Sequence, residues 1–275
     1  MEEIYEEILR LQRSGEKAVL VTVVEALGST PQGLGAKMLI YPDGRTFGTI
    51  GGGCMEAEIL EKARAVLDNE VPIKVRVRLS PDPISGRDAV CGGVIEAFLE
   101  PVRGEPRIVI LGAGHIGQAL ATMAQVAGYR IAVADDRIRY ANRERFPSAD
   151  EVVVDDFEAA LKRLRIGPRD HVVVVTRGHE HDKGCLRGAL QYPAAYLGMI
   201  GSKTKVAKTL KALSAEGMTQ ESLAKVHAPI GLDLGAETPG EIAVSILAEI
   251  IALHHRRDPA RIGSLRPAPT SQPAV

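Results

Sequence analysis

The stretch RIVILGAGHIGQALATMAQVAGYRIAVADD, residues 107–136, decides the fold. A short apolar run leads into GAGHIG at 112–117, a helical segment follows, and a second apolar run ends at Asp135. Uninterrupted Val and Ile runs indicate strands buried on both faces, as in a parallel sheet. Glycines at this spacing between a strand and a helix are typical of dinucleotide-binding βαβ units. We therefore predict that a Rossmann-like, doubly wound parallel sheet begins at Arg107.

Each glycine of this turn has a distinct expected task. Gly112 permits the tight turn, Gly114 lets a pyrophosphate touch the backbone, and Gly117 lets the helix pack closely on the strand. Asp135, or its neighbour Asp136, is placed to bind ribose hydroxyls. A purely structural turn is the alternative.

His115 is unusual at its place in the turn, where an apolar or small residue is more common. It is either a solvated loop histidine or a contact to phosphate or another ligand.

Further strands and a final helix extend the Rossmann pattern. The residues Thr238, Pro239 and Glu241 form an N-cap, a first-turn proline and a capping-box acid before a long apolar helix. Its positions Ile242 and Ile246, with Ile250 and Leu253, should pack on the sheet. The additional strands are expected in the runs RIAVA, EVVVD, HVVVV and AAYLGMI.

The first hundred residues predict a separate mixed α/β domain. A buried strand over 17–26 precedes a Gly- and Pro-rich loop, a hairpin around 42–44, a helix after 53, and two more strands near 73–79 and 94–99. The expected organisation is thus a domain over 1–100, a linker at 101–106, a Rossmann-like domain over 107–257 and a flexible tail over 258–275.

A second glycine turn, Gly51-Gly52-Gly53, enters a helix at Cys54. Its free backbone N–H groups at the positive end of the helix dipole predict an anion cradle, and the same field favours a thiolate at Cys54. The alternative is a tight turn with a small buried cysteine. Cys91 stands beside two more glycines, and neither thiol has the CxxC spacing of a zinc site.

Two more loops follow predicted strands, where an open α/β sheet places its ligands. In the first, Arg177, His179 and Asp182 are expected to face a substrate. A metal site made by His179, His181 and Asp182, with Cys185 nearby, is a disfavoured alternative, and no metal is predicted.

The second of these loops ends in Gly201-Ser202-Lys203. There Ser202 can cap a helix and Lys203 can reach a phosphate. An ordinary capped helix is the alternative.

Composition excludes several classes. The chain has 275 residues with 34 Lys and Arg against 35 Asp and Glu, so its net charge of −1 offers no broad field for nucleic acid. Three scattered cysteines do not make a secreted disulfide framework, the start is acidic and amphipathic rather than signal-like, and no apolar run could span a bilayer. We expect a soluble, cytoplasmic protein without a membrane span or nucleic-acid partner.

Taken together, the blocks resemble the xanthine dehydrogenase accessory factors, the XdhC/CoxI family. The match is carried in order by GSTPQGLGAKML at 28–39, GTIGGGCMEAEI at 48–59, CGG at 91–93, ILGAGHIG at 110–117, TRGHEHD at 176–182, YLGMIGSKTK at 196–205 and APIGLDLGAETPGEIAVSILAEI at 228–250. The resemblance implies an N-terminal XdhC/CoxI-type domain and a C-terminal Rossmann domain.

The resemblance also implies a function. Such proteins bind the molybdenum cofactor, support formation of its terminal sulfur ligand with a cysteine desulfurase, and deliver it to an apo molybdenum hydroxylase of the xanthine dehydrogenase or carbon monoxide dehydrogenase type. Cys54 and Cys91 become candidate thiols for cofactor or sulfur handling. Val90-Cys91 departs from the paired cysteines of the xanthine dehydrogenase members, which argues against a mechanism with two adjacent thiols.

Several alternatives stay open at this level. The cargo is molybdopterin or its dinucleotide, and the Rossmann domain takes NAD(P) or the nucleotide of the cofactor. A chaperone is favoured over a turnover enzyme, with an NAD(P)-dependent oxidoreductase as the rival. We expect a homodimer.

Overall fold

The computed structural model describes residues 2–28, 30, 32–78 and 93–262, which belong to two compact units, Met1–Glu105 and Pro106–Val275. Cys91 and most of the C-terminal tail lie outside the described residues. Cys54 and His179 are described through their backbone alone. Each unit is considered by itself.

The first unit is built on an antiparallel five-stranded sheet with the order β3-β2-β1-β5-β4. β1 and β5 pair along almost their whole length, with a bulge between Val23 and Glu25. The expected hairpin around 42–44 joins β2 to β3. The strands are β1 (Lys17–Leu27), β2 (Lys37–Ile40), β3 (Thr46–Gly48), β4 (Ile73–Arg78) and β5 (Val94–Arg103), and the helices are α1 (Glu2–Ser14) and α2 (Gly53–Asn69).

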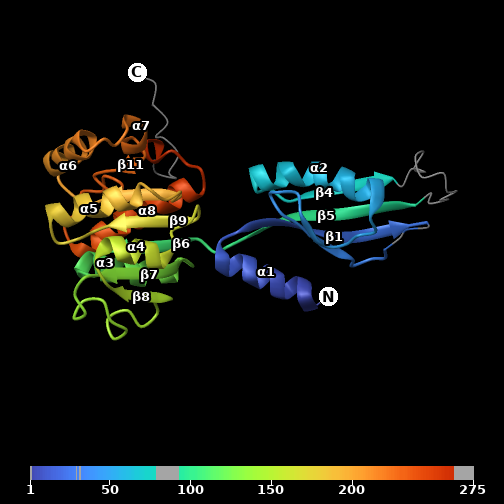
Figure 1. Cartoon of the computed structure of the whole chain (residues 1–275), viewed down its shortest axis with the longest axis horizontal. Helices are drawn as coiled ribbons and strands as arrows, with labels where there is room; N and C mark the ends of the chain where they lie inside the picture. The colour runs from blue at the N-terminus through green and yellow to red at the C-terminus, as the bar shows by residue number, and fades with distance from the viewer. Residues whose placement is uncertain (1, 29, 31, 79–92, 263–275) are drawn as a thin grey trace, which may run out of the picture. The chain divides into compact units, whose positions relative to one another are not determined.

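The two helices of this unit cover opposite faces of the sheet (Figure 1). On one face α1 packs through Ile4 and Leu11, and on the other α2 packs through a stripe with helical spacing. Alternation along β1 supplies both faces, because neighbouring side chains of a strand point to opposite sides. The buried stripe of α2 consists of Met55, Ile59, Ala63 and Val66.

The second unit is a six-stranded, all-parallel sheet with the order β11-β10-β9-β6-β7-β8. Counted from β6, this is the strand order of the Rossmann fold, so the predicted fold class is confirmed. The order reverses between β6 and β9, which is where such sheets open a crevice at the carboxyl ends of the strands. The strands are β6 (Arg107–Leu111), β7 (Arg130–Asp135), β8 (Glu151–Val154), β9 (Asp170–Val174), β10 (Tyr196–Met199) and β11 (Val226–His227).

Helices cover both faces of this sheet. Ile108 and Ile110 of β6 lie in the core shared with α3 and α8, whereas Val109 and Leu111 lie in the core shared with α4, α5 and α6. This explains why the strand reads as an unbroken apolar run. The helices are α3 (His115–Val126), α4 (Phe157–Leu164), α5 (His179–Ala189), α6 (Lys203–Ala215), α7 (Gln220–Leu223) and α8 (Pro239–His254), followed by the 3₁₀ turn η1 (Pro259–Arg261).

Helix α8 begins as the sequence predicts. Thr238 accepts a hydrogen bond from the N–H of Glu241, and the Glu241 carboxylate accepts one from the N–H of Thr238. Ile246 and Ile250 are fully buried in the core that α8 shares with α3.

In the first unit, β5 continues to Arg103 and so occupies the first half of the segment that the sequence indicated as a linker.

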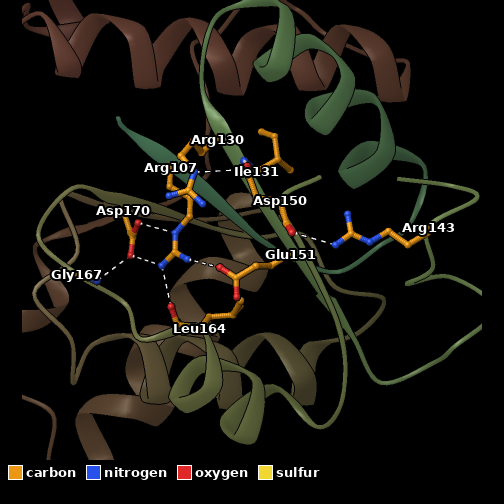
Figure 2. Close-up of polar contacts among 9 residues, drawn as sticks. All are labelled: Arg107, Arg130, Ile131, Arg143, Asp150, Glu151, Leu164, Gly167 and Asp170. Carbon is orange, nitrogen blue, oxygen red and sulfur yellow. Dashed lines mark hydrogen bonds and ion pairs between the residues drawn. The ribbon is translucent and has the colours of Figure 1, made fainter. Parts of the chain in front are cut away.

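The amino ends of β6 to β9 are joined by a dense polar network (Figure 2). Arg107 makes a bidentate pair with Asp170 at 2.9 and 2.8 Å and also donates to Glu151 and to the Leu164 carbonyl, both at 2.8 Å. The Asp170 carboxylate accepts a further bond from the N–H of Gly167. One guanidinium therefore ties together three strands and the end of α4.

Among the described residues, no helix has both the length and the apolar character that crossing a membrane requires.

Candidate functional site

The glycine turn after β6 shows why two of its glycines cannot carry side chains. Gly112 has φ +117°, and a Cβ there would lie 2.5 Å from the carbonyl oxygen of Val175. A Cβ on Gly117 would lie 2.2 Å from the carbonyl oxygen of Gly112. The turn and the close packing of α3 on the strand thus both depend on glycine.

Gly114 differs, because no atom lies within 4 Å of the place a Cβ would take. It is the N-cap of α3 and provides no side-chain cap, so the first N–H groups of the helix lack a protein acceptor of that kind. These groups border a cavity of about 230 Å³ at the carboxyl ends of β6, β7 and β9. The cavity is lined by Gly112, Gly114, His115, Ile116, Asp135, Arg137, Val175, Thr176, Arg177 and Pro239.

Asp135 lies in this cavity wall but is already engaged. The residue is 1% exposed, and its carboxylate accepts one bond from the N–H of Ala113 at 2.9 Å and three from Arg137, one of them from the backbone. Burial raises the pKa of the Asp135 carboxyl, but the hydrogen bonds from Arg137 and Ala113 outweigh it and hold the pKa below its usual range. Asp135, which the sequence predicted to bind ribose hydroxyls, therefore binds the glycine turn through the N–H of Ala113.

The loop after β9 contributes Thr176 and Arg177 to the cavity. Arg177 donates to Asp136 at 2.8 Å, which joins the ends of β9 and β7. Asp182 is fully buried, accepts a hydrogen bond from Thr176 and forms an ion pair with Lys205. Asp182, which the sequence predicted to contact a ligand, is thus bonded within the protein, and its ion pair with Lys205 holds the loop against α6.

The start of α6 matches the predicted cap. Ser202 accepts a bond from the N–H of Lys205 at 3.3 Å, and Gly201 has φ +159°. Lys203, expected to reach a phosphate, is exposed, whereas Lys205 pairs with Asp182. The sequence analysis did not predict roles for Lys205 and Arg137. They follow the predicted site residues Lys203 and Asp135 by two positions.

The glycine turn of the first unit holds an anion from its own chain. The Glu56 carboxylate accepts bonds from the Thr49 hydroxyl at 2.7 Å and from the N–H groups of Ile50 and Gly52 at 3.1 and 3.0 Å. Burial raises the pKa of the Glu56 carboxyl, but these bonds outweigh it and lower the pKa overall. No atom lies within 4 Å of where a Cβ would sit on Gly52 or Gly53, so the turn has open space beside it.

The described residues contain no group of three or more His, Cys, Asp or Glu side chains arranged to hold a metal ion. His181 contacts Phe157 and lies 3.4 Å from Arg177. Cys185 is buried, and this burial raises the pKa of its thiol well above the usual range. Neither is arranged as a ligand.

Comparison with known proteins yields matches along most of the chain. A relative described as uncharacterized protein YqeB of Escherichia coli (strain K12) is 36% identical over 252 residues, covering 90% of this chain and 46% of its own length. The chain thus spans less than half of that relative. A second relative, the molybdenum cofactor insertion chaperone PaoD of the same organism, is 26% identical, with 89% of this chain and 86% of PaoD covered.

A solved structure shares the fold. The crystal structure described as a xanthine dehydrogenase from Bacillus halodurans matches with a TM-score of 0.52 and 24% identity, covering 94% of this chain and 97% of that chain. Two family models match as well: that of the XdhC and CoxI family over residues 11–78, and that of the XdhC Rossmann domain over residues 108–250. Since the second match alone spans just over half of the 275 residues, the chain belongs to the XdhC/CoxI family.

Proposed function

We propose that this protein is a maturation chaperone for a molybdenum hydroxylase rather than an enzyme with its own turnover. It binds the molybdenum cofactor, supports formation of the terminal sulfur ligand together with a cysteine desulfurase, and delivers the cofactor to the apo hydroxylase. Family membership and the relative described as a molybdenum cofactor insertion chaperone support this role.

The observation that carries the proposal is the Thr49–Cys54 turn of the first unit. The cofactor is a pterin dithiolene with a phosphate, so it needs a place for an anion. Two N–H groups of this turn already hold the carboxylate of Glu56, and the space beside Gly52 and Gly53 is open. The turn thus holds one anion of its own chain, and a cofactor phosphate would take the open space beside Gly52 and Gly53 or displace Glu56.

Thiol chemistry would come from the same turn. Cys54 is the second residue of α2, and it is the first candidate thiol for the cofactor or its sulfur. A thiolate is a soft ligand suited to a metal or to sulfur. Cys91, in the CGG block of the sequence, is the second candidate.

The test is chemical analysis of the protein purified from a host that makes the molybdenum cofactor. We expect mass spectrometry to detect a released pterin, with about one molybdenum per chain. Cys54→Ala and Cys91→Ala should each lower the molybdenum content. Cys185→Ala is the matched control, because that thiol is buried in the second unit and should leave the content unchanged.

Two results would contradict the proposal. Unchanged molybdenum content in the Cys54→Ala, Cys91→Ala double variant would remove the thiols from the mechanism. Absence of any pterin would overturn the cargo itself. Delivery is tested by mixing loaded protein with apo hydroxylase, with and without a cysteine desulfurase and a sulfur source, and measuring hydroxylase activity.

The cavity of the second unit favours one rival, an NAD(P)-dependent oxidoreductase, because it lies where a Rossmann fold binds a dinucleotide. Hydride-transfer assays with small alcohols and acids separate the two candidates. Multiple turnovers without a molybdenum hydroxylase would favour the rival.

A further inference from the structure

Three arginine side chains converge on one tyrosine in the segment that directly follows β7. The guanidinium carbons of Arg137, Arg145 and Arg139 lie 3.8, 5.1 and 5.2 Å from the ring centroid of Tyr140. We call these four residues the arginine–tyrosine cluster. Arg137 also lines the cavity beside Gly114, so the cluster borders the predicted nucleotide site.

The neighbouring carboxylate has no place left for a ribose hydroxyl. An ionised carboxylate offers about four lone-pair sites. Asp135 receives four N–H donors, one from Ala113 and three from Arg137, at 2.8 to 3.1 Å. The acceptor that usually selects a free ribose is therefore saturated.

The cluster carries more positive charge than the acids in contact with it balance. Arg137 is paired with Asp135 and lies 3.6 Å from Asp136, which itself pairs with Arg177. Arg145 instead donates to neutral oxygens, the Ala113 carbonyl and the Gln118 amide, and its buried Nε has no hydrogen-bond acceptor among the described residues. A buried donor of this kind is costly until an acceptor reaches it.

We propose that this cavity takes a dinucleotide whose ribose carries a phosphate, as in NADP(H), in preference to one with free ribose hydroxyls, as in NAD(H). The pyrophosphate belongs at the N–H groups beside Gly114, and the ribose phosphate belongs at the cluster. Arginine suits such a group, because its planar fork binds phosphate oxygens in pairs. The proposal rests on nucleotide binding by the second unit and not on the molybdenum cofactor.

The test is calorimetric titration of the full chain with NADP⁺, NAD⁺, 2′,5′-ADP and 5′-AMP. We expect each 2′-phosphorylated ligand to bind at least 10-fold more tightly than its partner without that phosphate. The advantage should shrink with added salt, because charge carries it.

Variants locate the effect. Arg139→Gln, an exposed change, should lower NADP⁺ affinity several-fold and leave NAD⁺ affinity unchanged. Arg137→Gln should reverse the preference, because it removes one charge and frees lone pairs on Asp135. Arg143→Gln is the matched control, since Arg143 lies in the same segment but donates to the carbonyl of Ala149 and, as Figure 2 shows, to that of Asp150.

Each contrary outcome has its own meaning. Equal affinities, or tighter NAD⁺ binding, overturn the phosphate preference and leave nucleotide binding in place. Absence of binding by all four ligands overturns the inference as a whole. The pterin and molybdenum content measured for the proposed function is a separate readout, so either proposal can fail alone.

Discussion

The two ends of the parallel sheet in the second unit are built on opposite principles. At the amino ends, the N–H groups of the Arg107 guanidinium donate hydrogen bonds to Asp170, Glu151 and the Leu164 carbonyl, all within the protein. At the carboxyl ends, the turn at Gly114 leaves helix N–H groups beside a cavity of about 230 Å³. Both ends are rich in polar groups, but at the amino ends Arg107 is bonded within the protein, whereas among the described residues no side chain caps the first N–H groups of α3.

This difference indicates which end of the sheet stabilises the fold and which end binds a ligand. A polar network whose members satisfy one another contributes to stability and has little to offer a ligand. Open N–H groups next to a cavity stabilise nothing until an acceptor arrives. Substitutions at the amino ends should therefore change unfolding, and those at the carboxyl ends should change binding.

The largest expected effect is that of Arg107→Ala. It leaves the buried carboxylate of Asp170 without its bidentate partner, and removal of one member of a buried ion pair costs about 3–5 kcal/mol. Urea denaturation of the second unit measures the loss. Arg130→Ala is the matched control on the same edge, because the pair of Arg130 with Asp150 is more exposed and is worth about 1 kcal/mol or less. Equal losses for the two variants would remove the special role of Arg107.

The next effect concerns His171, which is 4% exposed at the start of β9 among Tyr129, Tyr196 and His254. Burial, and then the charge of His254, lower the pKa of His171 to about 4. The His171 side chain is protonated near pH 6.5 in the unfolded chain but only near pH 4 in the folded chain. The free energy of unfolding is therefore highest above pH 6.5 and falls by about 3 kcal/mol as the pH drops to 4.

Denaturation at pH 7 and pH 5 tests this expectation. His171→Leu should flatten the pH dependence, whereas His115→Asn at the exposed carboxyl end should leave it unchanged. A wild-type stability that is the same at both pH values would contradict the assignment.

A pair of glycines in one turn separates folding from binding. Gly117→Ala places a Cβ 2.2 Å from the Gly112 carbonyl oxygen and should cost about 1–3 kcal/mol of stability. Gly114→Ala meets no atom within 4 Å and should cost less than about 1 kcal/mol, but its methyl group would stand where a pyrophosphate approaches. We expect at least a 10-fold loss of nucleotide affinity for Gly114→Ala in titration. Unchanged affinity would place the ligand elsewhere.

The smallest effect is expected from Thr238→Ala, which removes the capping box of α8. The expected loss of stability is about 1 kcal/mol, measured by thermal unfolding. Because Pro239 lines the cavity, a modest drop in nucleotide affinity should accompany it. Thr219→Ala, at the cap of the four-residue helix α7, should cost less. A larger loss of thermal stability for Thr219→Ala than for Thr238→Ala would contradict this expectation.

Local rules predicted the strands, the glycine turn and the cap of α8, because Val and Ile runs, positive-φ glycines and capping boxes act over a few residues. They predicted a tight turn at Gly112 and close packing of the helix on the strand at Gly117, and both positions have no room for a Cβ in the structure. They also placed Ser202 at the start of α6 correctly.

Pairing between distant side chains was beyond such rules. Asp135 and Asp182 stand at strand and helix ends where ligands bind, but each is already paired with a basic side chain, Arg137 or Lys205. Likewise, Glu56 fills part of the turn at Gly52, which the sequence presented as free. A short spacing hints at such partners, yet only the folded backbone shows which donor reaches which carboxylate.

The most direct test of the contrast between the two ends is hydrogen–deuterium exchange with and without saturating NADPH. We predict that NADPH slows amide exchange in residues 112–117, 136–145 and 176–178 and leaves residues 150–151 and 164–170 unchanged. Protection at the amino ends in place of the carboxyl ends, or no protection at either, would contradict the account.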